Sequence, residues 1–448
     1  MSNIYSNKKM AKLSDDFTQQ LYSDFAANPK YRAVENAATK NGLLNALERR
    51  SSHAANIPEF SIDLTKDPVT NQKQSGRCWM FAALNTMRHK MIANYKLEDF
   101  ELSQAYTFFW DKYEKSNWFF EMLISNPDMD DRKLKFLLAT PQGDGGQWDM
   151  IVALFQKYGA VPKAAYPESA ASSNSRELDQ YLDKLLRQGA EKLRLAMKKS
   201  EDVETLRKKL LQEIFNFLAA TLGLPPQQFE FAFRDKKGEN FTTFSGSPKE
   251  FYEQFVNVDL DQYVSIINAP TADKPYNKSY TVEFLGNVVG ARPVKHLNLE
   301  MSRFKELAIA QMQQGETVWF GCDVGQVSNR KDGLLTMDAY DFDSALDIKF
   351  TQDKAARLDY AESLMTHAMV LTGVDIDEAS GKSKKWKVEN SWGDDVGKKG
   401  YFVASDAWMD EFTYQIVVRK EFLSAEELAA YEAEPKVLLP WDPMGALA

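Results

Sequence analysis

The sequence predicts an α+β protein in which helices dominate the chain before about residue 222 and strands dominate it after about residue 315. Apolar residues recur at helical spacing from residue 78 and again over about 172–222, and short β-branched and aromatic runs follow later. Hydrophobic residues make up 44% of the 448 and aromatic residues 12%, which is typical of a well-packed globular protein.

Amphipathic helices are expected over about residues 14–50, followed by a loop that contains Pro58 and Pro68. A buried helix is expected to begin near Cys78, just after Gly76. Its apolar positions recur at i, i+3, i+4, i+7 and i+11, which defines one face of a helix: Met80, Ala83, Leu84, Met87 and Met91.

Residues 140–150, TPQGDGGQWDM, form a glycine-rich loop. The segment from about 172 to 222 is rich in leucine and in charges of alternating sign, which indicates helices with a solvated face. Gly223 and the Pro225-Pro226 pair close it, and residues 227–300 show no clear period.

Five strands are predicted after residue 315, namely TVWFGCDV, THAMVLTGV, KWKVENSW, GYFVAS and YQIVVRK. The chain from Pro435 onward contains three prolines and ends WDPMGALA, so it cannot form a regular helix.

Composition excludes some classes of function. A net charge of −9 makes nucleic acid an unexpected partner, because phosphate binding usually requires a basic surface. No stretch resembles a signal peptide or reaches the roughly 20 apolar residues of a membrane span. No membrane partner is therefore expected. Only two cysteines occur, which favours a reducing compartment and therefore a cytoplasmic protein.

Cys78 is the candidate nucleophile because it lies in the first turn of the predicted helix, where unpaired N–H groups and a partial positive charge favour thiolate. Cys322 lies in an apolar strand pattern and is interpreted as a buried structural thiol.

A thiol nucleophile requires a base, and the chain has four histidines. His89 lies eleven residues beyond Cys78 on one helix, roughly 16 Å away. His53 and His296 are interpreted as surface or packing residues. His367 begins a strand, and folding the following hairpin about its midpoint, position 378.5, places His367 beside Asn390. An Asn390 amide oxygen could then orient the imidazole.

The tetrahedral intermediate also needs donors for its oxyanion. The backbone N–H of Cys78 is one candidate. A side-chain amide from the preceding loop is the second, and the residues alone leave Gln72 and Gln74 as alternatives.

These residues together resemble the papain superfamily. Its pattern of Gln, five residues and Cys-Trp matches Gln72 and Cys78-Trp79 and selects Gln72. The strand THAMVLTGV resembles its histidine strand, and Asn390-Ser391-Trp392-Gly393 its asparagine motif. Gly145-Gly146 resembles the glycine pair that hydrogen-bonds an extended substrate.

Two departures from the pattern of the papain superfamily point to one branch of it. Cys78 and His367 are 289 residues apart, and Ser75 stands where secreted members have a disulfide cysteine. The chain therefore resembles the branch of bleomycin hydrolase and bacterial aminopeptidase C along nearly its whole length. Val396 stands where many secreted members have a second tryptophan.

The resemblance implies a papain-like fold with a helical left part, a β-barrel-like right part, a large helical insertion and a C-terminal arm in the cleft. The expected segments are an N-terminal helical segment (1–66), the left part with the nucleophile helix (67–170), the helical insertion (171–300), the right part with the His and Asn strands (301–422) and the C-terminal arm (423–448).

The resemblance further implies a broad-specificity cytosolic cysteine aminopeptidase, assembled as a homohexamer, that acts on peptides with a free N-terminus. Cys78, His367, Asn390 and Gln72 would be catalytic. Trp392 would shield the contact between His367 and Asn390, with Trp79 also in support. No metal or organic cofactor is implied.

The carboxylate of Ala448 would pair with the substrate's α-amino group. Three alternatives remain. The chain could be an endopeptidase with the same triad and the arm outside the cleft, a non-catalytic binding protein, or a DNA-binding homologue with secondary peptidase activity.

Overall fold

The computed structural model describes residues 11–446, and the chain divides into two compact units. Among the described residues, the first unit comprises 11–55 and 337–351, and the second comprises 56–336 and 352–446. In the described part of the chain, no helix is both long and apolar enough to cross a membrane.

The first unit is helical, as the sequence predicts for residues 14–50. Ser14 caps the first helix by accepting a hydrogen bond from the N–H of Phe17, and Asn28 caps the second in the same way. The described helices of this unit are α1 (Asp15–Ala27), α2 (Pro29–Asn41), α3 (Leu43–Leu47), α4 (Arg50–Ala55) and α14 (Phe342–Leu346).

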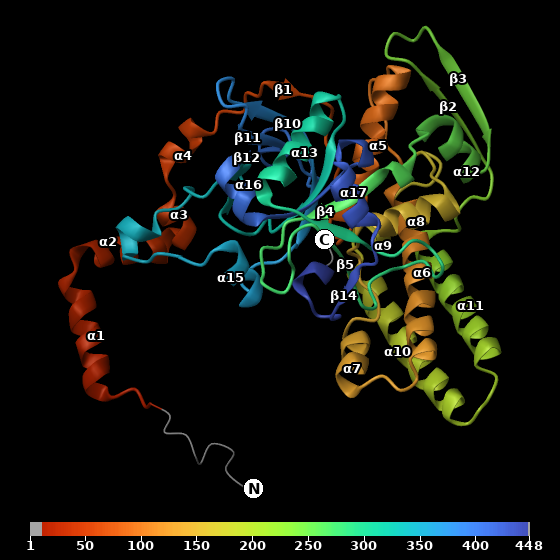
Figure 1. Ribbon diagram of the computed structural model, residues 1–448, viewed down its shortest axis with the longest axis horizontal. Helices are drawn as coiled ribbons and strands as arrows, with labels where there is room; N and C mark the ends of the chain where they lie inside the picture. Colours follow the sequence, from red (N-terminus) through yellow and green to blue (C-terminus); the bar gives the residue numbers. More distant parts are fainter. Residues whose placement is uncertain (1–10, 447–448) are drawn as a thin grey trace. The chain divides into compact units, whose positions relative to one another are not determined.

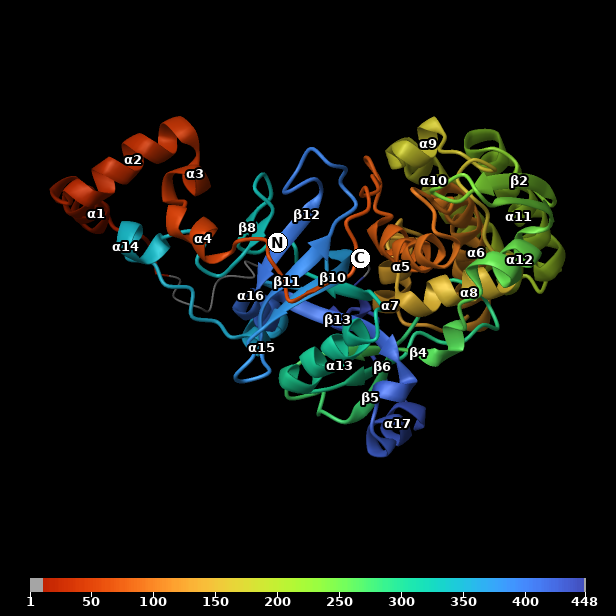
Figure 2. The ribbon, with the colours of Figure 1, turned by 90° about the horizontal axis from the view of Figure 1, so that it is seen from above.

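The helices between residues 78 and 251 gather on one side of the sheet of the second unit (Figures 1 and 2). The predicted buried helix begins at Cys78 as α5, and α10 and α11 both pack on α6. α10 buries a leucine stripe and exposes its charges. The elements are α5 (Cys78–Tyr95), α6 (Gln104–Ser125), α7 (Asp131–Ala139), α8 (Trp148–Tyr158), α9 (Ala170–Ser173), α10 (Arg176–Lys198), α11 (Val203–Leu222), α12 (Pro248–Phe251) and the π-helix η1 (Tyr252–Val256).

The second unit also contains a twelve-stranded sheet, in the order β14-β5-β6-β4-β13-β7-β10-β11-β12-β9-β8 with β1 paired to β10. A separate hairpin joins β2 (Phe229–Arg234) to β3 (Phe241–Gly246). The strands are β1 (Ile62–Asp63), β4 (Tyr263–Ile267), β5 (Lys278–Val282), β6 (His296–Asn298), β7 (Val318–Cys322), β8 (Ser328–Asn329), β9 (Leu334–Leu335), β10 (His367–Ile376), β11 (Ser383–Glu389), β12 (Tyr401–Ser405), β13 (Thr413–Arg419) and β14 (Lys436–Leu438).

The segment predicted as a helical insertion, residues 171–300, differs from that description in its second half. It is helical to Leu222, but β4, β5 and β6 belong to the large sheet, so sheet structure begins before residue 301. Every residue of β4 is buried. Burial on both faces removes the alternation of polar and apolar residues by which a strand is recognised in sequence.

The core consists of two clusters that place α5 against the sheet. One cluster joins α5 and the helices around it to one set of sheet residues, and the other packs α13 and α16 on a second set. α5 lies against β10 and β7, which brings Cys78 to the strand of His367. The remaining elements are α13 (Met301–Gln313), α15 (Lys354–Asp359), α16 (Asp406–Phe412), α17 (Ala425–Glu432) and the 3-10 turns η2 (Leu260–Gln262), η3 (Lys420–Phe422) and η4 (Pro443–Gly445).

Candidate active site

Cys78 is the first residue of α5, and its side chain is buried. Only 3% of the residue is exposed, and burial raises the pKa of its thiol to about 11. The N–H groups of Ala368, Trp79 and Cys78 itself oppose this effect. The position at a helix start is therefore as predicted, and burial opposes the thiolate that the helix N-terminus favours.

His367 lies next to Ala368, whose N–H reaches the Cys78 sulfur. Its ring Nε2 lies 2.9 Å from Oδ1 of Asn390, and both side chains are buried. Because an amide oxygen only accepts hydrogen bonds, Nε2 carries the proton and Nδ1 is the basic nitrogen. Burial lowers the pKa of His367 to about 4, although the bond to Asn390 raises it. The imidazole is therefore neutral at neutral pH and able to accept a proton.

The hairpin that joins β10 to β11 does not have the predicted register. Val370 pairs with Glu389, and the turn runs from Asp377 to Lys382, one position later than predicted. Because the turn lies one position later, His367 and Asn390 are not direct cross-strand partners, and two bulges interrupt the ladder between Leu371 and Ile376. Their side chains meet nevertheless, because Asn390 lies in the loop just beyond β11.

Trp392 packs on the ring of His367. Its ring centroid lies 4.9 Å from that of His367 at an interplanar angle of 33°, and Phe402 packs on its edge at 5.9 Å. This packing holds the imidazole from a second direction. The packing of Trp392 on His367 was expected only from the resemblance of residues 390–393 to the asparagine motif, since the local sequence around a tryptophan in a polar loop does not show which residue it contacts.

Gln72 reaches the same site from the loop before α5. Its Oε1 accepts a hydrogen bond from the hydroxyl of Ser391 at 2.6 Å, and its Nε2 donates to the carbonyl of Ser75 at 2.7 Å. Gln74 instead forms a backbone bridge with Asn174. The contact with Ser391 ties Gln72, and not Gln74, to the residue that follows Asn390.

The glycine loop packs tightly on the nucleophile helix. A Cβ atom at Gly146 would lie 2.6 Å from the ring of Trp79, so no larger residue fits without movement. The Trp79 indole N–H donates to the carbonyl of Asp144 at 2.6 Å, and the Lys115 ammonium donates to that of Gly145 at 2.7 Å. Trp79 and the loop therefore hold each other in place.

Asp144 links this loop to the one that precedes Cys78, and sequence reasoning missed it. Its carboxylate accepts a hydrogen bond from the Gly76 N–H at 2.8 Å and pairs with Lys112 at 2.6 Å. Ser175 also donates to it. Burial opposes the ionised form, but Lys112 and these donors hold the pKa of Asp144 well below its usual range. A carboxylate in a glycine-rich loop gives no sign in the sequence of these distant partners.

The C-terminal arm lies beside the glycine loop at Ala446. The side-chain amide of Gln147 donates to the carbonyl of Ala446 at 2.6 Å, and Met444 is buried. Asp442 pairs with Lys274 at 2.9 Å, and β14 pairs with β5 in parallel. The arm is thus fixed up to Ala446. The predicted role of Ala448 falls on a residue outside the described part of the chain.

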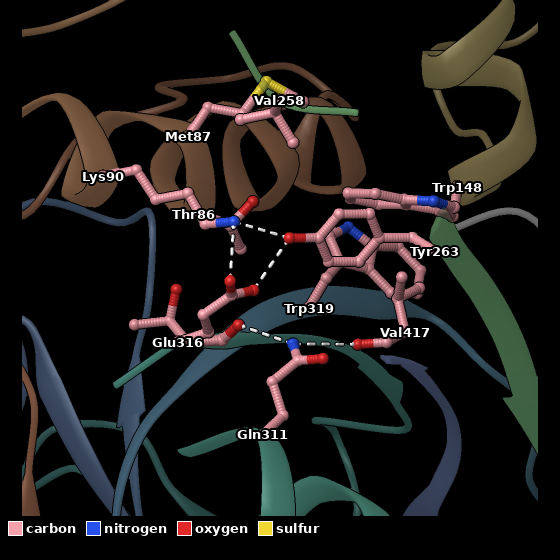
Figure 3. Close-up of a pocket in the computed structure, with 11 residues that line it drawn as sticks. Thr86, Met87, Lys90, Trp148, Val258, Tyr263, Gln311, Glu316, Trp319 and Val417 are labelled. Carbon is pink, nitrogen blue, oxygen red and sulfur yellow. Dashed lines mark hydrogen bonds and ion pairs between the residues drawn. The ribbon is translucent and has the colours of Figure 1, made fainter. Parts of the chain in front are cut away.

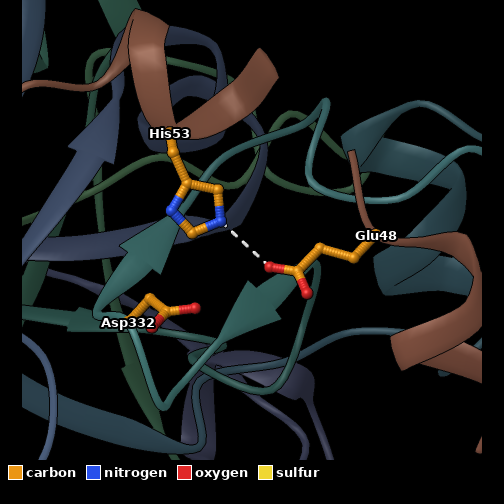
Figure 4. A group of neighbouring side chains, drawn as sticks. All are labelled: Glu48, His53 and Asp332. Carbon is orange, nitrogen blue, oxygen red and sulfur yellow. Dashed lines mark hydrogen bonds and ion pairs between the residues drawn. The ribbon is translucent and has the colours of Figure 1, made fainter. Parts of the chain in front are cut away.

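The remaining histidines have other partners, as expected. His53 lies 2.9 Å from Glu48 (Figure 4). His89 lies 2.7 Å from Glu389 and 3.2 Å from Asp67. Burial disfavours its charged form, but these carboxylates raise its pKa to about 9.

His296 is buried against the hydroxyl of Ser265 at 2.7 Å, and burial lowers its pKa to about 4. Cys322 is fully buried and pairs with His367 across β7 and β10. Its thiol pKa is raised by burial, which fits a structural role.

Two cavities flank these elements. The one shown in Figure 3 measures about 20 Å³ and is bounded by Lys90, Tyr263 and Glu316, which bond to one another. That volume is about one water molecule, so it is too small for a peptide. A second of about 420 Å³ lies between Gly143 and Gly445, beside the arm, and its size is in the range of small-ligand pockets.

A thiol at a helix start, a neutral imidazole and an orienting amide together define the class of thiol acyl-transfer enzymes. The family model of the Peptidase C1-like family matches residues 12–445, and the chain belongs to this family. Aminopeptidase C of Lactococcus lactis subsp. lactis is 75% identical over 436 residues, 97% of this chain and 100% of the relative.

Two further relatives agree with this assignment. Bleomycin hydrolase of Mus musculus is 37% identical, with 98% of this chain and 99% of the relative covered. The crystal structure of PepW from Lactobacillus rhamnosis has a TM-score of 0.95 at 52% identity, with 98% and 100% covered. The predicted family and the predicted α+β class are confirmed.

Proposed function

We propose that this chain is a cysteine aminopeptidase that releases N-terminal residues from peptides by thiol acyl transfer. The contact of His367 with Asn390 beside the Cys78 thiol carries this proposal, and the names of the relatives support it. As sulfur attacks the first peptide carbonyl, the thiol proton passes to Nδ1 of His367.

The next steps use the same groups. Protonated His367 delivers its proton to the leaving amine, and the acyl group remains on sulfur until water attacks it. Asn390 holds the ring through Nε2, and Trp392 keeps water from that contact. Gln72 and the Cys78 N–H stabilise the oxyanion, since one N–H of the Gln72 amide remains after the bond to Ser75.

Replacement of the nucleophile tests the catalytic assignment. Cys78→Ser is expected to abolish peptidase activity, whereas Cys322→Ser, the matched change at the other buried cysteine, is expected to retain it. Release of p-nitroaniline from an aminoacyl anilide measures both. Full activity in Cys78→Ser would instead favour a binding protein that retains the fold, or a different nucleophile.

The arm explains why an aminopeptidase is favoured over an endopeptidase. Gly145 and Gly146 would align the substrate, and the bond from Gln147 to Ala446 anchors the arm beside them. Two residues further, the carboxylate of Ala448 would pair with the substrate's α-amino group and block longer chains. Removal of residues 445–448 is expected to slow N-terminal trimming and admit N-acetylated peptides. Unchanged trimming with blocked peptides still refused would exclude this role.

We also propose a homohexamer in the cytoplasm. No described residue of α1 is buried, and Phe17, Leu21 and Phe25 are 51%, 50% and 43% exposed on one side of it. Such an apolar stripe suits contact with another copy of the chain. Light scattering should give six times the 51.0 kDa chain mass, and Phe17→Ser with Leu21→Ser a smaller species. Both cysteines are free, which suits a reducing compartment.

A further inference from the structure

Arg330 is an exposed cation at the edge of the candidate site. Its guanidinium carbon lies 5.2 Å from the ring centroid of Trp392, the residue that packs on His367. Among the residues that the structure describes, no carboxylate lies within ion-pair distance of Arg330. An arginine that stacks on tryptophan keeps its N–H edges free for a planar anion.

The chemistry of the reaction indicates which part of the substrate passes this cation. Ala446 of the arm lies beside the glycine loop. Under the proposed function, the arm occupies the N-terminal side of the substrate. His367 protonates the leaving amine, so the leaving peptide lies on the side of His367 and Trp392. Arg330 is close enough for its charge to lower the pKa of His367, after the larger effect of burial.

A leaving peptide carries a carboxylate of its own. One residue spans at most about 3.6 Å, so the C-terminal carboxylate of a di- or tripeptide lies within roughly 4–7 Å of the cleaved bond. The distances from the Trp392 ring centroid to that of His367, 4.9 Å, and to the Arg330 guanidinium carbon, 5.2 Å, are of the same size. In a long peptide the terminal carboxylate lies beyond this region.

We infer that Arg330 is a specificity-determining residue that binds the carboxylate of the leaving peptide and thereby favours short substrates with a free C-terminus. The inference rests on the proposed function, because it takes the orientation of the substrate from it. An acidic side chain in the leaving peptide could supply the same carboxylate, and the test separates the two sources.

The test compares leucyl-glycyl-glycine, its C-terminal amide and an amidated tripeptide with glutamate in third position, each at low and at high salt. Wild-type enzyme should cleave the free acid with a kcat/KM roughly fivefold above that of the amide, the scale of one exposed charge-assisted bond. Arg330→Gln should bring this ratio to about one, and Arg330→Lys should retain part of it. High salt should reduce the wild-type ratio.

The matched control is Lys331→Gln, which removes the same charge from the exposed neighbour. Lys331→Gln should leave unchanged both the basal rate and the ratio of kcat/KM between the free acid and the amide. If this variant loses the ratio as much as Arg330→Gln does, the preference comes from the general positive charge of the region, and the assignment to Arg330 is overturned. A ratio that persists in Arg330→Gln overturns it as well. If only the glutamate peptide responds, side-chain carboxylates are the ligand and the preference for short peptides is wrong.

Binding of the leaving group separates this inference from the proposed function. NMR titration of glycylglycine and its amide needs no turnover, so it decides the matter even if the wild-type chain cleaves no peptide. Glycylglycine should bind wild-type protein more tightly than its amide, and Arg330→Gln should remove the difference. Equal affinities of the two ligands for wild-type protein would overturn the role of Arg330.

Discussion

Asn390→Ala removes the group that holds the imidazole. The lost contact is the 2.9 Å hydrogen bond from Nε2 of His367, between side chains that are 4% and 0% exposed. A buried hydrogen bond of this kind is worth about 1–3 kcal/mol. Because the bond to Asn390 raises the pKa of His367, its loss makes the imidazolium formed during attack less stable. Since Trp392 still packs on the ring, kcat/KM should fall roughly 5- to 150-fold and not to zero.

The assay is kcat/KM for an aminoacyl anilide over the pH range. Asn268→Ala is the matched control, because Asn268 is a buried asparagine whose partners are Leu299 and Lys354. That variant should lose stability but keep kcat/KM within about twofold. Equal losses in the two variants, or full activity in Asn390→Ala, would show that Asn390 does not act through His367.

Two further predictions concern elements around the site. Burial disfavours the charged form of His89, but the two carboxylates beside it raise its pKa to about 9. The stabilisation of the fold by protonated His89 is therefore complete below pH 6.5 and is lost as the pH rises through 9. His89→Gln should therefore cost about 3 kcal/mol at pH 6 and much less at pH 10, which urea titrations against wild type can measure; a constant cost would contradict it. Gly146→Ala should lower kcat/KM because its Cβ would lie 2.6 Å from the Trp79 ring, whereas a Cβ at Gly143 meets only Thr140 at 3.9 Å. Gly143→Ala should be tolerated, and equal kinetics in the two variants would refute the packing explanation.

The sequence predicted the elements whose signals are local. The apolar spacing after Cys78 predicted the helix and placed Cys78 in its first turn. β-branched runs predicted β10 and β11, although β11 ends at Glu389, one residue before the predicted end at Asn390. The His367–Asn390 contact was reached through a simple hairpin that the structure replaces with a bulged one. The predicted contact forms despite this error because the two side chains are long enough to meet when the pairing of their strands is shifted by one position.

What the sequence did not reveal depends on burial and on distant contacts. Asp144 lies among turn residues, yet Lys112 and Ser175 approach it from helices elsewhere in the chain. The raised pKa of Cys78 follows from its burial, which a helix-start argument does not include. Nothing local marks Arg330 as a neighbour of Trp392, since the two residues are 62 positions apart in the sequence.

The central claim is that Cys78 releases the first residue of a peptide whose α-amino group is free. The most direct measurement is the rate of N-terminal residue release from one peptide in its free and N-acetylated forms, with wild-type enzyme and with Cys78→Ser. Rapid release from the free peptide by wild-type enzyme alone, with the acetylated form refused, is the expected result. Equal cleavage of both forms, or release by Cys78→Ser at the wild-type rate, would contradict the claim.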